Sequence, residues 1–383
     1  MLSDRLPSSR RGPLGLRLGP EPIRHLYLHT PFCATVCPYC AFHVHTGSAR
    51  EMRVFVTALL REWEKLRKSL PVEVETLYLG GGTPSLLPLD AFRQLADAFR
   101  PWESVEATLE ANPRTVTREK AAAWRDLGIG RVSLGVQSLD PAVLRTLGRR
   151  HGPQDVERTV AILREAGFGN INVDLLFGVP GQSPASWEET LTRVIAIGPE
   201  HVSAYELTYE EDTPFFEARA AGVWREDEEL SIAMYRTAWN LLESSGYRQY
   251  EVSNYARPGW ASLHNQGYWM GNDYLGLGPG ACSTVGLRRW QNRRNTTDYI
   301  AALSAGQDPP REEEALSKEV RQRERLLLGL RTSRGVPYSW IEGEAEHARA
   351  LIGQGLAELS DGTFRLTPEG RLLADGIAGL FVG

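Results

Sequence analysis

Three of the four cysteines lie close together, and their spacing could support metal chemistry. Cys33, Cys37 and Cys40 follow the pattern C-x3-C-x2-C inside the stretch from Tyr27 to Phe42. Thiolates this close in sequence can converge on one metal centre. Three of them on a cubane 4Fe-4S cluster would leave one iron without a protein ligand, and that iron could bind a further molecule.

Two other uses of these cysteines have to be weighed. An odd trio of neighbouring cysteines is a poor disulfide framework, and so few cysteines in 383 residues are typical of a reducing cytoplasm, where we expect this protein. Zinc is the stronger alternative, because His29, His43 or His45 could supply the fourth ligand of a closed tetrahedral site. The spacing alone does not separate zinc from an iron-sulfur cluster.

Around the cysteines, short apolar runs rich in β-branched residues alternate with helical patterns. Strands are predicted at residues 26–30, 75–80, 106–111, 131–136, 170–177 and 201–208. Helices are predicted at residues 153–166, 184–198 and 226–244. This alternation is typical of parallel β/α units. About six such units fit before residue 250, fewer than the eight of a closed barrel, so we expect an α/β fold with a partial (β/α)6 barrel.

The residues at the carboxyl ends of these strands are the next candidates, because a parallel barrel keeps its chemistry there. The second strand runs into Gly-Gly-Gly-Thr-Pro at residues 80–84, and glycines allow close backbone approach to a ligand. The third strand ends at Glu110, whose carboxylate can accept hydrogen bonds from a ribose diol or cap a helix. Gln137 and Asp174 lie in otherwise apolar runs, where isolated polar side chains are either satisfied core groups or ligands.

These features together resemble the radical-SAM superfamily, whose signature is C-x3-C-x2-C with an aromatic residue, here Tyr39, before the last cysteine. The resemblance implies that Cys33, Cys37 and Cys40 hold a 4Fe-4S cluster and that the open iron binds S-adenosylmethionine (SAM). In that superfamily, reduction splits SAM into methionine and a 5′-deoxyadenosyl radical, so the cofactor carries the difficult step. Residues 80–84 resemble the segment that holds the SAM amino group.

Within the superfamily, the chain resembles the coproporphyrinogen oxidase-like branch. The motifs G-G-G-T-P, E-x-N-P, G-V-Q-S and H-N-x-x-Y-W follow the cysteines in order. An arginine is a suitable bidentate partner for the SAM carboxylate, and the resemblance implies Arg149 for this role, with the adjacent Arg150 as the alternative. It also implies SAM contacts at Glu110, Gln137 and Asp174. The same resemblance assigns further cofactor contacts to Tyr27, Tyr39, Phe42, Gly82 and Thr83.

The motif His-Asn-Gln-Gly-Tyr-Trp at residues 264–269 is similar to the haem chaperone subgroup of this branch, the HemW type. A histidine beside two aromatic rings can bind a haem iron while the rings pack on the macrocycle. A histidine and a tryptophan packed beneath the barrel rim would give the same pattern. The resemblance implies that His264 binds haem as cargo. It also implies that haem-accepting proteins are partners, among them membrane respiratory enzymes reached by transient membrane contact.

The alternative within the branch is an enzyme, oxygen-independent coproporphyrinogen III dehydrogenase. There the deoxyadenosyl radical would remove a hydrogen atom from a propionate side chain, and loss of carbon dioxide would leave a vinyl group. Two departures argue against this activity. That group resembles C-x3-C-x2-C-x-C, whereas Phe42 stands at the fourth cysteine position here, and its longer N-terminal region has only a short Arg-rich tail as counterpart.

Two further features receive no role from the sequence. The fourth cysteine, Cys282, is placed in a glycine-rich turn with residues 276–281 and is expected to be buried rather than reactive. Arg288, Arg289, Arg293 and Arg294 form a basic cluster, which could pair with carboxylates or form a solvated face.

Composition and segment patterns bound the rest of the chain. A net charge of −5 argues against a nucleic-acid binder, and no apolar run approaches the roughly 18 residues of a membrane span. We expect a disordered tail at residues 1–22, with a transit peptide as the alternative, and a barrel with accessory elements at 23–304. A Pro-rich acidic linker at 305–315 would lead to residues 316–383, where helices and a predicted hairpin resemble a small winged-helix-like domain.

Overall fold

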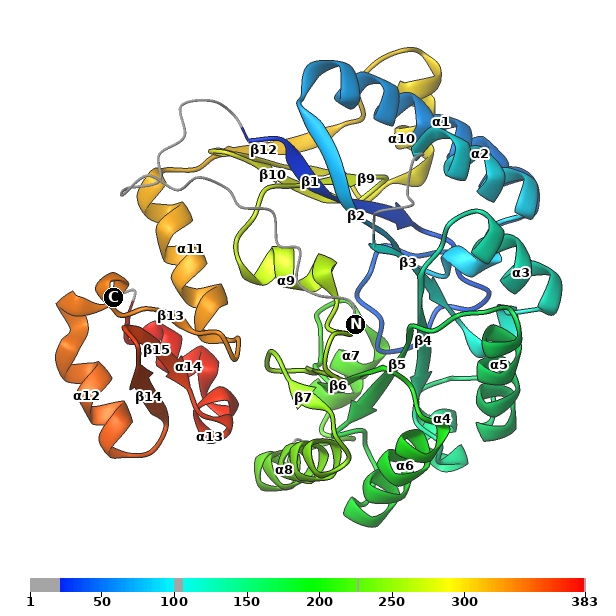
Figure 1. Cartoon of the computed structure of the whole chain (residues 1–383). Coiled ribbons are helices and arrows are strands. Elements are labelled where there is room, and N and C mark those ends of the chain that lie inside the picture. The colour runs from blue at the N-terminus through cyan, green and yellow to red at the C-terminus, as the bar shows by residue number, and fades with distance from the viewer. Residues whose placement is uncertain (1–20, 100–105, 226, 382–383) are drawn as a thin grey trace, which may run out of the picture.

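The computed structural model describes residues 21–99, 106–225 and 227–381 (Figure 1). Nearly all of the predicted tail therefore lies outside the described residues. The described chain begins in a twelve-stranded sheet, whose strand order is β12-β11-β10-β9-β1-β2-β3-β4-β5-β6-β8-β7. A second, three-stranded sheet lies near the C-terminus.

Six consecutive parallel strands form the centre of the large sheet, and each pairs with the next. They are β1 (Ile23–Thr30), β2 (Val72–Gly81), β3 (Glu106–Ala111), β4 (Arg131–Gln137), β5 (Ile171–Phe177) and β6 (His201–Glu206). Each strand predicted from the sequence overlaps one of these six, which confirms the run of parallel β/α units.

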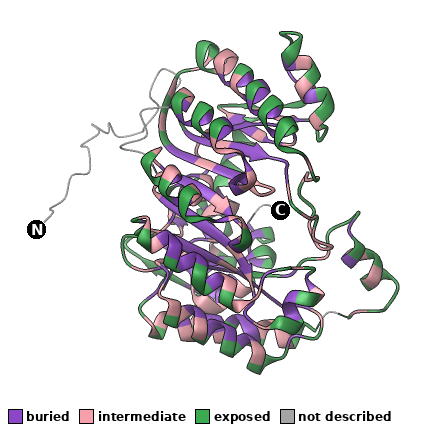
Figure 2. Ribbon diagram, turned by 90° about the vertical axis from the view of Figure 1, so that its right-hand side faces the viewer, coloured by how far each residue is buried: buried purple, intermediate pink, exposed green. Residues whose placement is uncertain are grey.

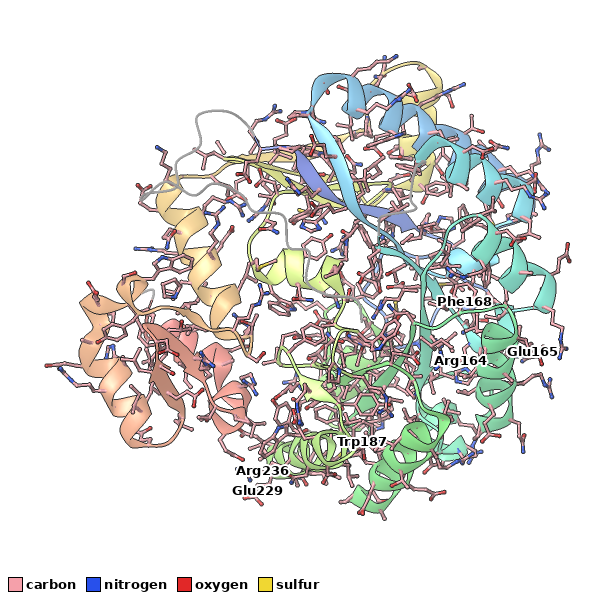
Figure 3. All side chains as sticks on the ribbon, viewed as in Figure 1. Arg164, Glu165, Phe168, Trp187, Glu229 and Arg236 are labelled. Atoms are coloured by element: carbon pink, nitrogen blue, oxygen red, sulfur yellow. The ribbon has the colours of Figure 1, made fainter. Side chains whose placement is uncertain are left out.

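Helices follow these strands and lie on the outer side of the curved sheet (Figure 1). Trp187 of α6 shows how they pack: its side chain is fully buried, and its indole N–H donates to the carbonyl of Met234 in α8 at 2.9 Å (Figure 3). The helices are α1 (Ala49–Ser69), α2 (Leu89–Phe99), α3 (Arg118–Asp126), α4 (Pro141–Thr146), α5 (Pro153–Glu165), α6 (Pro184–Ile197), α7 (Pro214–Ala220) and α8 (Glu228–Ser244), with the short 3-10 turns η1 (Pro84–Leu86) and η2 (Pro113–Thr115).

The strands are buried along most of their length, while the helices expose one side to solvent (Figure 2). Successive side chains of a strand point to opposite faces of the sheet. In β1, Leu26 and Leu28 belong to the hydrophobic core, whereas the alternate residues Tyr27 and His29 face a cavity inside the barrel. The chain therefore packs an apolar layer under the helices and keeps polar side chains for the barrel interior.

The sheet continues beyond the six strands at both edges. Strand β9 pairs parallel to the other side of β1, and β8 pairs antiparallel to β6. The partial barrel predicted from the sequence is thus extended by chain that follows it. The added elements are β7 (Arg248–Gln249), β8 (Asn254–Ala256), α9 (Leu263–Trp269), β9 (Tyr274–Leu277), β10 (Cys282–Val285), β11 (Arg288–Asn292), α10 (Thr296–Ser304) and β12 (Arg311–Ala315).

Strand β12 corrects one prediction. Its residues 311–315 were expected to belong to a linker, but they pair antiparallel with β11 at the edge of the sheet. Opposite charges across the two strands stabilise such pairing. Here Arg288 of β11 lies 3.3 Å from the carboxylate of Glu313, and exposed acidic side chains are compatible with an edge strand.

The C-terminal region has a separate hydrophobic core, in which Phe364 is fully buried. It docks on the barrel through polar contacts: Arg371 donates twice to Gln249 of β7, and Arg236 of α8 (Figure 3) pairs with Glu369 at 2.7 Å. Its elements are α11 (Lys318–Leu330), β13 (Val336–Pro337), η3 (Tyr338–Trp340), η4 (Glu342–Glu344), α12 (Ala345–Gly353), β14 (Ala357–Ser360), β15 (Thr363–Leu366), α13 (Pro368–Leu372) and α14 (Ala374–Gly379).

Among the described residues, no helix combines the length and the apolar character that a membrane crossing requires. The exact division into domains at residues 304 and 316 stays a prediction.

Candidate functional site

The loop that follows β1 carries the three clustered cysteines. Its two ends are held together, because the backbone N–H of Cys33 donates to the carbonyl of His45 at 2.9 Å. All three thiols are free and half-buried. The hydroxyl of Thr83 donates to the sulfur of Cys33 at 3.5 Å, and the guanidinium of Arg149 donates to that of Cys37 at the same distance. Two residues far apart in the sequence, both predicted to contact the cofactor, therefore lie against the cysteines.

The three histidines named as possible zinc ligands have other contacts in this structure. The predicted fourth ligands are occupied: His29 bonds Tyr27 and the carbonyl of His43, while His43 and His45 both bond the hydroxyl of Thr296. No three His, Cys, Asp or Glu side chains of the described residues are grouped to hold one metal ion. In a 4Fe-4S cluster each cysteine binds a different iron, so the sulfurs stand farther apart than the ligands of a single ion.

Burial controls the protonation of these thiols. It raises the pKa of Cys33 to about 11, although the hydrogen bond from Thr83 opposes the shift, and burial also raises the pKa of Cys40. Both are therefore protonated thiols at neutral pH in the metal-free protein. Binding of iron requires thiolates, so cluster insertion here must release protons.

The glycine segment after β2 packs directly on the cysteine loop. The N–H of Gly82 donates to the carbonyl of Thr30, and the N–H of Thr83 donates to that of Phe32, each at 2.7 Å. A Cβ atom on Gly82 would lie 2.6 Å from the carbonyl oxygen of Phe32. Glycine is thus required at this position by contact between two backbone segments.

Glu110 lies at the end of β3, beside the glycine segment. One carboxylate oxygen accepts from the N–H of Gly81 at 3.0 Å, and the other accepts from the hydroxyl of Tyr78 at 2.9 Å. Burial, together with the nearby charge of Asp174, raises the pKa of Glu110 to about 8. The carboxyl group is therefore poised between its two protonation states near neutral pH.

Asp174 of β5 is held by two neighbouring side chains. Its oxygens accept from the hydroxyl of Ser133 and from the amide of Asn172, each at 2.8 Å, and burial raises its pKa. Such fixed contacts are compatible with both interpretations of Asp174, a satisfied core group and a ligand whose second acceptor site stays free.

Gln137 and Arg149 gather around Gly135 of β4. A Cβ atom on Gly135 would lie 3.2 Å from a nitrogen of Arg149 and 3.3 Å from the amide nitrogen of Gln137. Gln137 has a φ of 69°, which is uncommon for a residue other than glycine and marks a locally strained backbone. Arg149 contacts the cysteine loop, whereas Arg150 is exposed, so the structure favours Arg149 of the two alternatives.

Tyr39 packs on the outer part of the cysteine loop. Its ring lies 5.9 Å from that of Phe215, and burial raises its pKa. This side chain therefore helps to anchor the loop on the helix α7.

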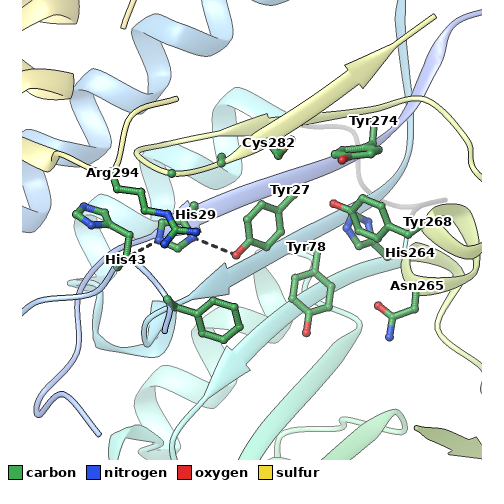
Figure 4. A pocket seen from close by; sticks show the side chains of 13 residues that line it. Tyr27, His29, His43, Tyr78, His264, Asn265, Tyr268, Tyr274, Cys282 and Arg294 are labelled. Atoms are coloured by element: carbon green, nitrogen blue, oxygen red, sulfur yellow. Dashed lines mark hydrogen bonds between the residues drawn. The ribbon is translucent and has the colours of Figure 1, made fainter. Parts of the chain in front are cut away.

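A cavity of about 360 Å³ lies inside the barrel, between β1, β2, α9 and the turn before β10 (Figure 4). It brings together three of the predicted residues, Tyr27, Phe42 and His264. It also contains residues that received no role from the sequence, namely Tyr78, Tyr274, Cys282 and Arg294. Tyr78 could have been found from the alternation along β2, because it lies on the same strand face as Gly80.

Cys282 corrects a further expectation. It begins strand β10, is half-buried and lines this cavity, instead of being buried in a turn. Glycine is required at position 276 of the neighbouring strand β9. A Cβ atom there would lie 2.2 Å from the carbonyl oxygen of Cys282.

His264 lies in the wall of the cavity at the start of α9. Its side chain is buried, with Nδ1 2.7 Å from the hydroxyl oxygen of Thr76. Nε2 has no hydrogen-bond partner among the described residues. The ring stacks on Tyr78 at 5.1 Å and meets Tyr268 edge-on at 4.8 Å.

The environment of His264 keeps its imidazole neutral. Burial, with smaller effects of His25 and the positive charge of Arg131, lowers the pKa of His264 to about 3. If Nδ1–H donates to Thr76, the lone pair of Nε2 is free to bind a metal. The site therefore fits a haem iron, because a buried nitrogen that lacks a partner would gain one.

A carboxylate on β3 positions this histidine. Glu106 accepts from the hydroxyl of Ser262 and from the backbone N–H groups of Leu263 and His264, at 2.9 to 3.0 Å. Three donors at the first turn of α9 thus converge on one half-buried acid, which fixes the helix against the barrel. The sequence offered a signal for this contact only in the acidic residue at the start of the strand.

Comparisons with known proteins agree with this geometry. The model of the Radical SAM superfamily matches residues 27–194, and that of the HemN C-terminal domain matches residues 316–373. A solved structure described as "Coproporphyrinogen III oxidase (HemN) from Escherichia coli is a Radical SAM enzyme" has a TM-score of 0.82 at 24% identity, covering 95% of this chain and 91% of that one. This likeness shows the shared α/β fold.

Curated relatives are more similar in sequence. "Heme chaperone HemW" of Mycobacterium tuberculosis is 36% identical over 372 residues, which covers 94% of each chain. The protein of the same name from Bacillus subtilis is 31% identical over 379 residues, covering 94% of this chain and 100% of the relative. The chain therefore belongs to the HemW family of the radical SAM superfamily.

Proposed function

We propose that this protein binds haem in the cavity beside His264 and passes it to haem-requiring proteins. The observation that carries the proposal is the environment of His264: the residue belongs to the cavity wall, and its buried Nε2 has no hydrogen-bond partner among the described residues. The relatives named as heme chaperones support the same function.

A 4Fe-4S cluster on Cys33, Cys37 and Cys40, with SAM bound to it, belongs to the same proposal. When reduced, such a cluster with SAM supplies a 5′-deoxyadenosyl radical. In this chain, the guanidinium of Arg149 would pair with the SAM carboxylate. Glu110, held by Tyr78 and Gly81, would accept hydrogen bonds from a diol.

The partners and the compartment follow from the same chemistry. We propose haem-accepting proteins as partners, including membrane respiratory enzymes. Four free cysteines, three of which have a proposed iron-binding role, favour a reducing compartment, and we propose the cytoplasm.

The coproporphyrinogen dehydrogenase alternative has less support. Phe42 stands where that group has a fourth cysteine, and its ring is 67% exposed at the edge of the haem cavity. The solved oxidase shares the fold at 24% identity, whereas the Mycobacterium tuberculosis and Bacillus subtilis relatives, at 36% and 31% identity, are named as chaperones.

A haem titration tests the proposal. We expect wild-type protein to bind haem in a stoichiometric complex with a Soret band typical of histidine ligation. His264→Ala should weaken binding at least about tenfold, because the metal loses a ligand. His25→Ala is the matched control: His25 bonds the same Thr76 hydroxyl, but its Nε2 already has a partner in Asn272.

Two outcomes would contradict the proposal. Equal losses in the two variants would mean that packing around Thr76, and not ligation, supports haem. Conversion of coproporphyrinogen III to a vinyl-bearing product by reconstituted protein with SAM and reductant would establish the enzyme instead, provided that 5′-deoxyadenosine is also formed.

A further inference from the structure

The structure separates the four arginines of the basic cluster into different roles. Arg289 forms a bidentate pair with Glu324 of α11, with distances of 2.7 and 2.9 Å. Arg288 pairs with Glu313 across the β11–β12 ladder at 3.3 Å. Both guanidinium groups therefore already have a carboxylate and stabilise the docking of neighbouring elements.

Arg294 differs from these two. Among the described residues, its side chain has no hydrogen bond and no ion pair, although it lines the cavity that contains His264. The titratable side chains that it influences are His29 and His43, and its charge lowers the pKa of both. A positive charge beside two histidines has no acidic partner here, so it can accept one from a ligand.

A second cavity of about 380 Å³ also includes Arg294. The acid that lines this second cavity, Glu51, is already engaged, because it accepts from both the backbone N–H and the hydroxyl of Ser48 at 2.7 Å. The nearest candidate for an internal ion pair is thus occupied as a helix cap.

The backbone places Arg294 firmly. It lies between the end of β11 and Asn295, whose side chain caps α10 by accepting from the N–H of Asp298 at 3.0 Å. Gly280 opposes it across the cavity rim, where a Cβ atom would lie 3.4 Å from the Cγ of Arg294. With the backbone already fixed, binding of a ligand has to order only the side chain and not the loop as well.

We propose that Arg294 binds a propionate carboxylate of the haem held at His264. Figure 4 places Arg294 and His264 at opposite ends of the cavity, with Tyr27 and Tyr78 between them. Haem has the same layout, with a metal at its centre, an aromatic macrocycle, and carboxylates at one edge. A guanidinium matches a carboxylate in a bidentate geometry, and the tyrosine rings offer apolar faces to the macrocycle.

This inference rests on the proposed haem site, and the same carboxylate chemistry could come from SAM. Arg149, whose guanidinium donates to the sulfur of Cys37, already accounts for the SAM carboxylate in the proposed function. The haem propionate is therefore the carboxylate that remains without a partner.

The test compares haem with its dimethyl ester, in which both carboxylates are masked, on full-length protein. Arg294→Ala should weaken haem binding roughly five- to tenfold, as expected for a partly exposed charged pair, and should not weaken binding of the ester further. Arg293→Ala removes the same charge one residue away and should leave haem affinity unchanged. Arg294→Lys should retain part of the affinity, because the charge remains but the fork is lost.

Three outcomes would overturn the inference. Equal losses in Arg293→Ala and Arg294→Ala would show general charge attraction, and equal losses for haem and ester would show a structural role of Arg294. Weaker SAM binding in Arg294→Ala, with haem affinity intact, would assign the guanidinium to SAM. If wild-type protein binds neither haem nor its ester, the proposed function itself fails and the inference fails with it.

Discussion

The cysteine loop and the His264 cavity adjoin each other inside the barrel, but they are built in different ways. The loop takes its three sulfurs from eight consecutive residues, 33–40, and its backbone is held by hydrogen bonds to the neighbouring glycine segment. The cavity is assembled from residues between Tyr27 and Arg294. They come from the first two strands of the barrel with the connection between them, and from the chain that follows its sixth strand. One site is local in the sequence, and the other exists only in the folded chain.

The two regions also differ in what they leave unsatisfied. At the loop, the backbone is paired and the thiols are protonated, so the metal itself must complete the site. At the cavity, the neutral imidazole of His264 has a buried nitrogen, and Arg294 has a guanidinium, that lack a partner among the described residues. The comparison teaches that a metal-dependent site can be recognised from spacing, whereas a preformed pocket is recognised from its unpaired groups.

Removing one cysteine should have the largest effect, because it should abolish iron binding at the loop and leave haem binding at the cavity unchanged. In Cys33→Ala, we expect the iron content after anaerobic reconstitution to fall from about four atoms per chain to nearly none, because a cubane with two protein ligands is not retained. Haem affinity should stay within about twofold of wild type, since none of the cavity residues is changed. Iron analysis and the brown charge-transfer absorption measure the first effect, and a haem titration measures the second.

Cys282→Ala is the matched control, because it removes the remaining cysteine, which lies on the cavity side. It should keep its iron. Loss of iron in Cys282→Ala as well would mean that the two regions share a ligand, and the comparison above would be wrong.

A methyl group at Gly82 should test the backbone contact of the loop. In Gly82→Ala, the new Cβ would meet the carbonyl oxygens of Phe32 and Thr30 at 2.6 and 2.9 Å, and backbone atoms cannot move aside cheaply. We expect the free energy of unfolding of the metal-free protein to fall by about 1–3 kcal/mol, as for other overpacked sites. Chemical denaturation measures this change.

Gly130→Ala provides the comparison, because no heavy atom lies within 4 Å of the added Cβ. Its stability should be unchanged or raised by up to about 1 kcal/mol, through the smaller entropy of the unfolded chain. If both variants behave alike, the loop is more pliable than its contacts suggest.

The last test concerns Glu110, which is bonded both to the glycine segment and to Tyr78 of the cavity. Its pKa is raised from 4.5 to about 8 in the folded protein, so its stabilising contribution is full below pH 4.5 and is lost as the pH rises toward 8. Glu110→Gln stays neutral. Between pH 5 and 8, the variant should therefore gain stability relative to wild type by up to about 1.4 kcal/mol per pH unit.

Asp174→Asn sharpens this measurement, because the charge of Asp174 is the second cause of the raised pKa of Glu110. In that variant, the stability loss should end at a lower pH than in wild type. The free energies of unfolding of wild type and Glu110→Gln can be plotted against pH. Plots that stay parallel from pH 5 to 8 would show that the carboxyl group ionises normally.

The sequence predicted much of the first region and less of the second. The six central strands were predicted because apolar runs alternate with amphipathic helices, and the cysteine loop follows from spacing within eight residues. Strand β12 was taken for a linker, because five residues with three consecutive glutamates show no strand pattern until Arg288 and its neighbours pair with them. The positions of Cys282 and Arg294 in one cavity depend on pairing between β9 and β1, which no local pattern encodes.

His264 is an intermediate case. Its motif was visible in the sequence, but its free Nε2 was not, because that state depends on Thr76 and Glu106 from two other strands. The resemblance therefore identified the residue, and the fold supplied the reason why it can act.

The pairing of β9 with β1 has a further consequence for how the chain is made. Strand β1 carries the cysteine loop, and its second neighbour, β9, ends at Leu277, about 250 residues later. A chain that emerges from the ribosome therefore has an open edge at β1 until two thirds of its length have been synthesised. Such long-range closure is a slow step in folding, and unpaired edges invite association between chains. The capping of β1 by its distant neighbour is thus also the end of the interval in which the nascent chain is most exposed to aggregation.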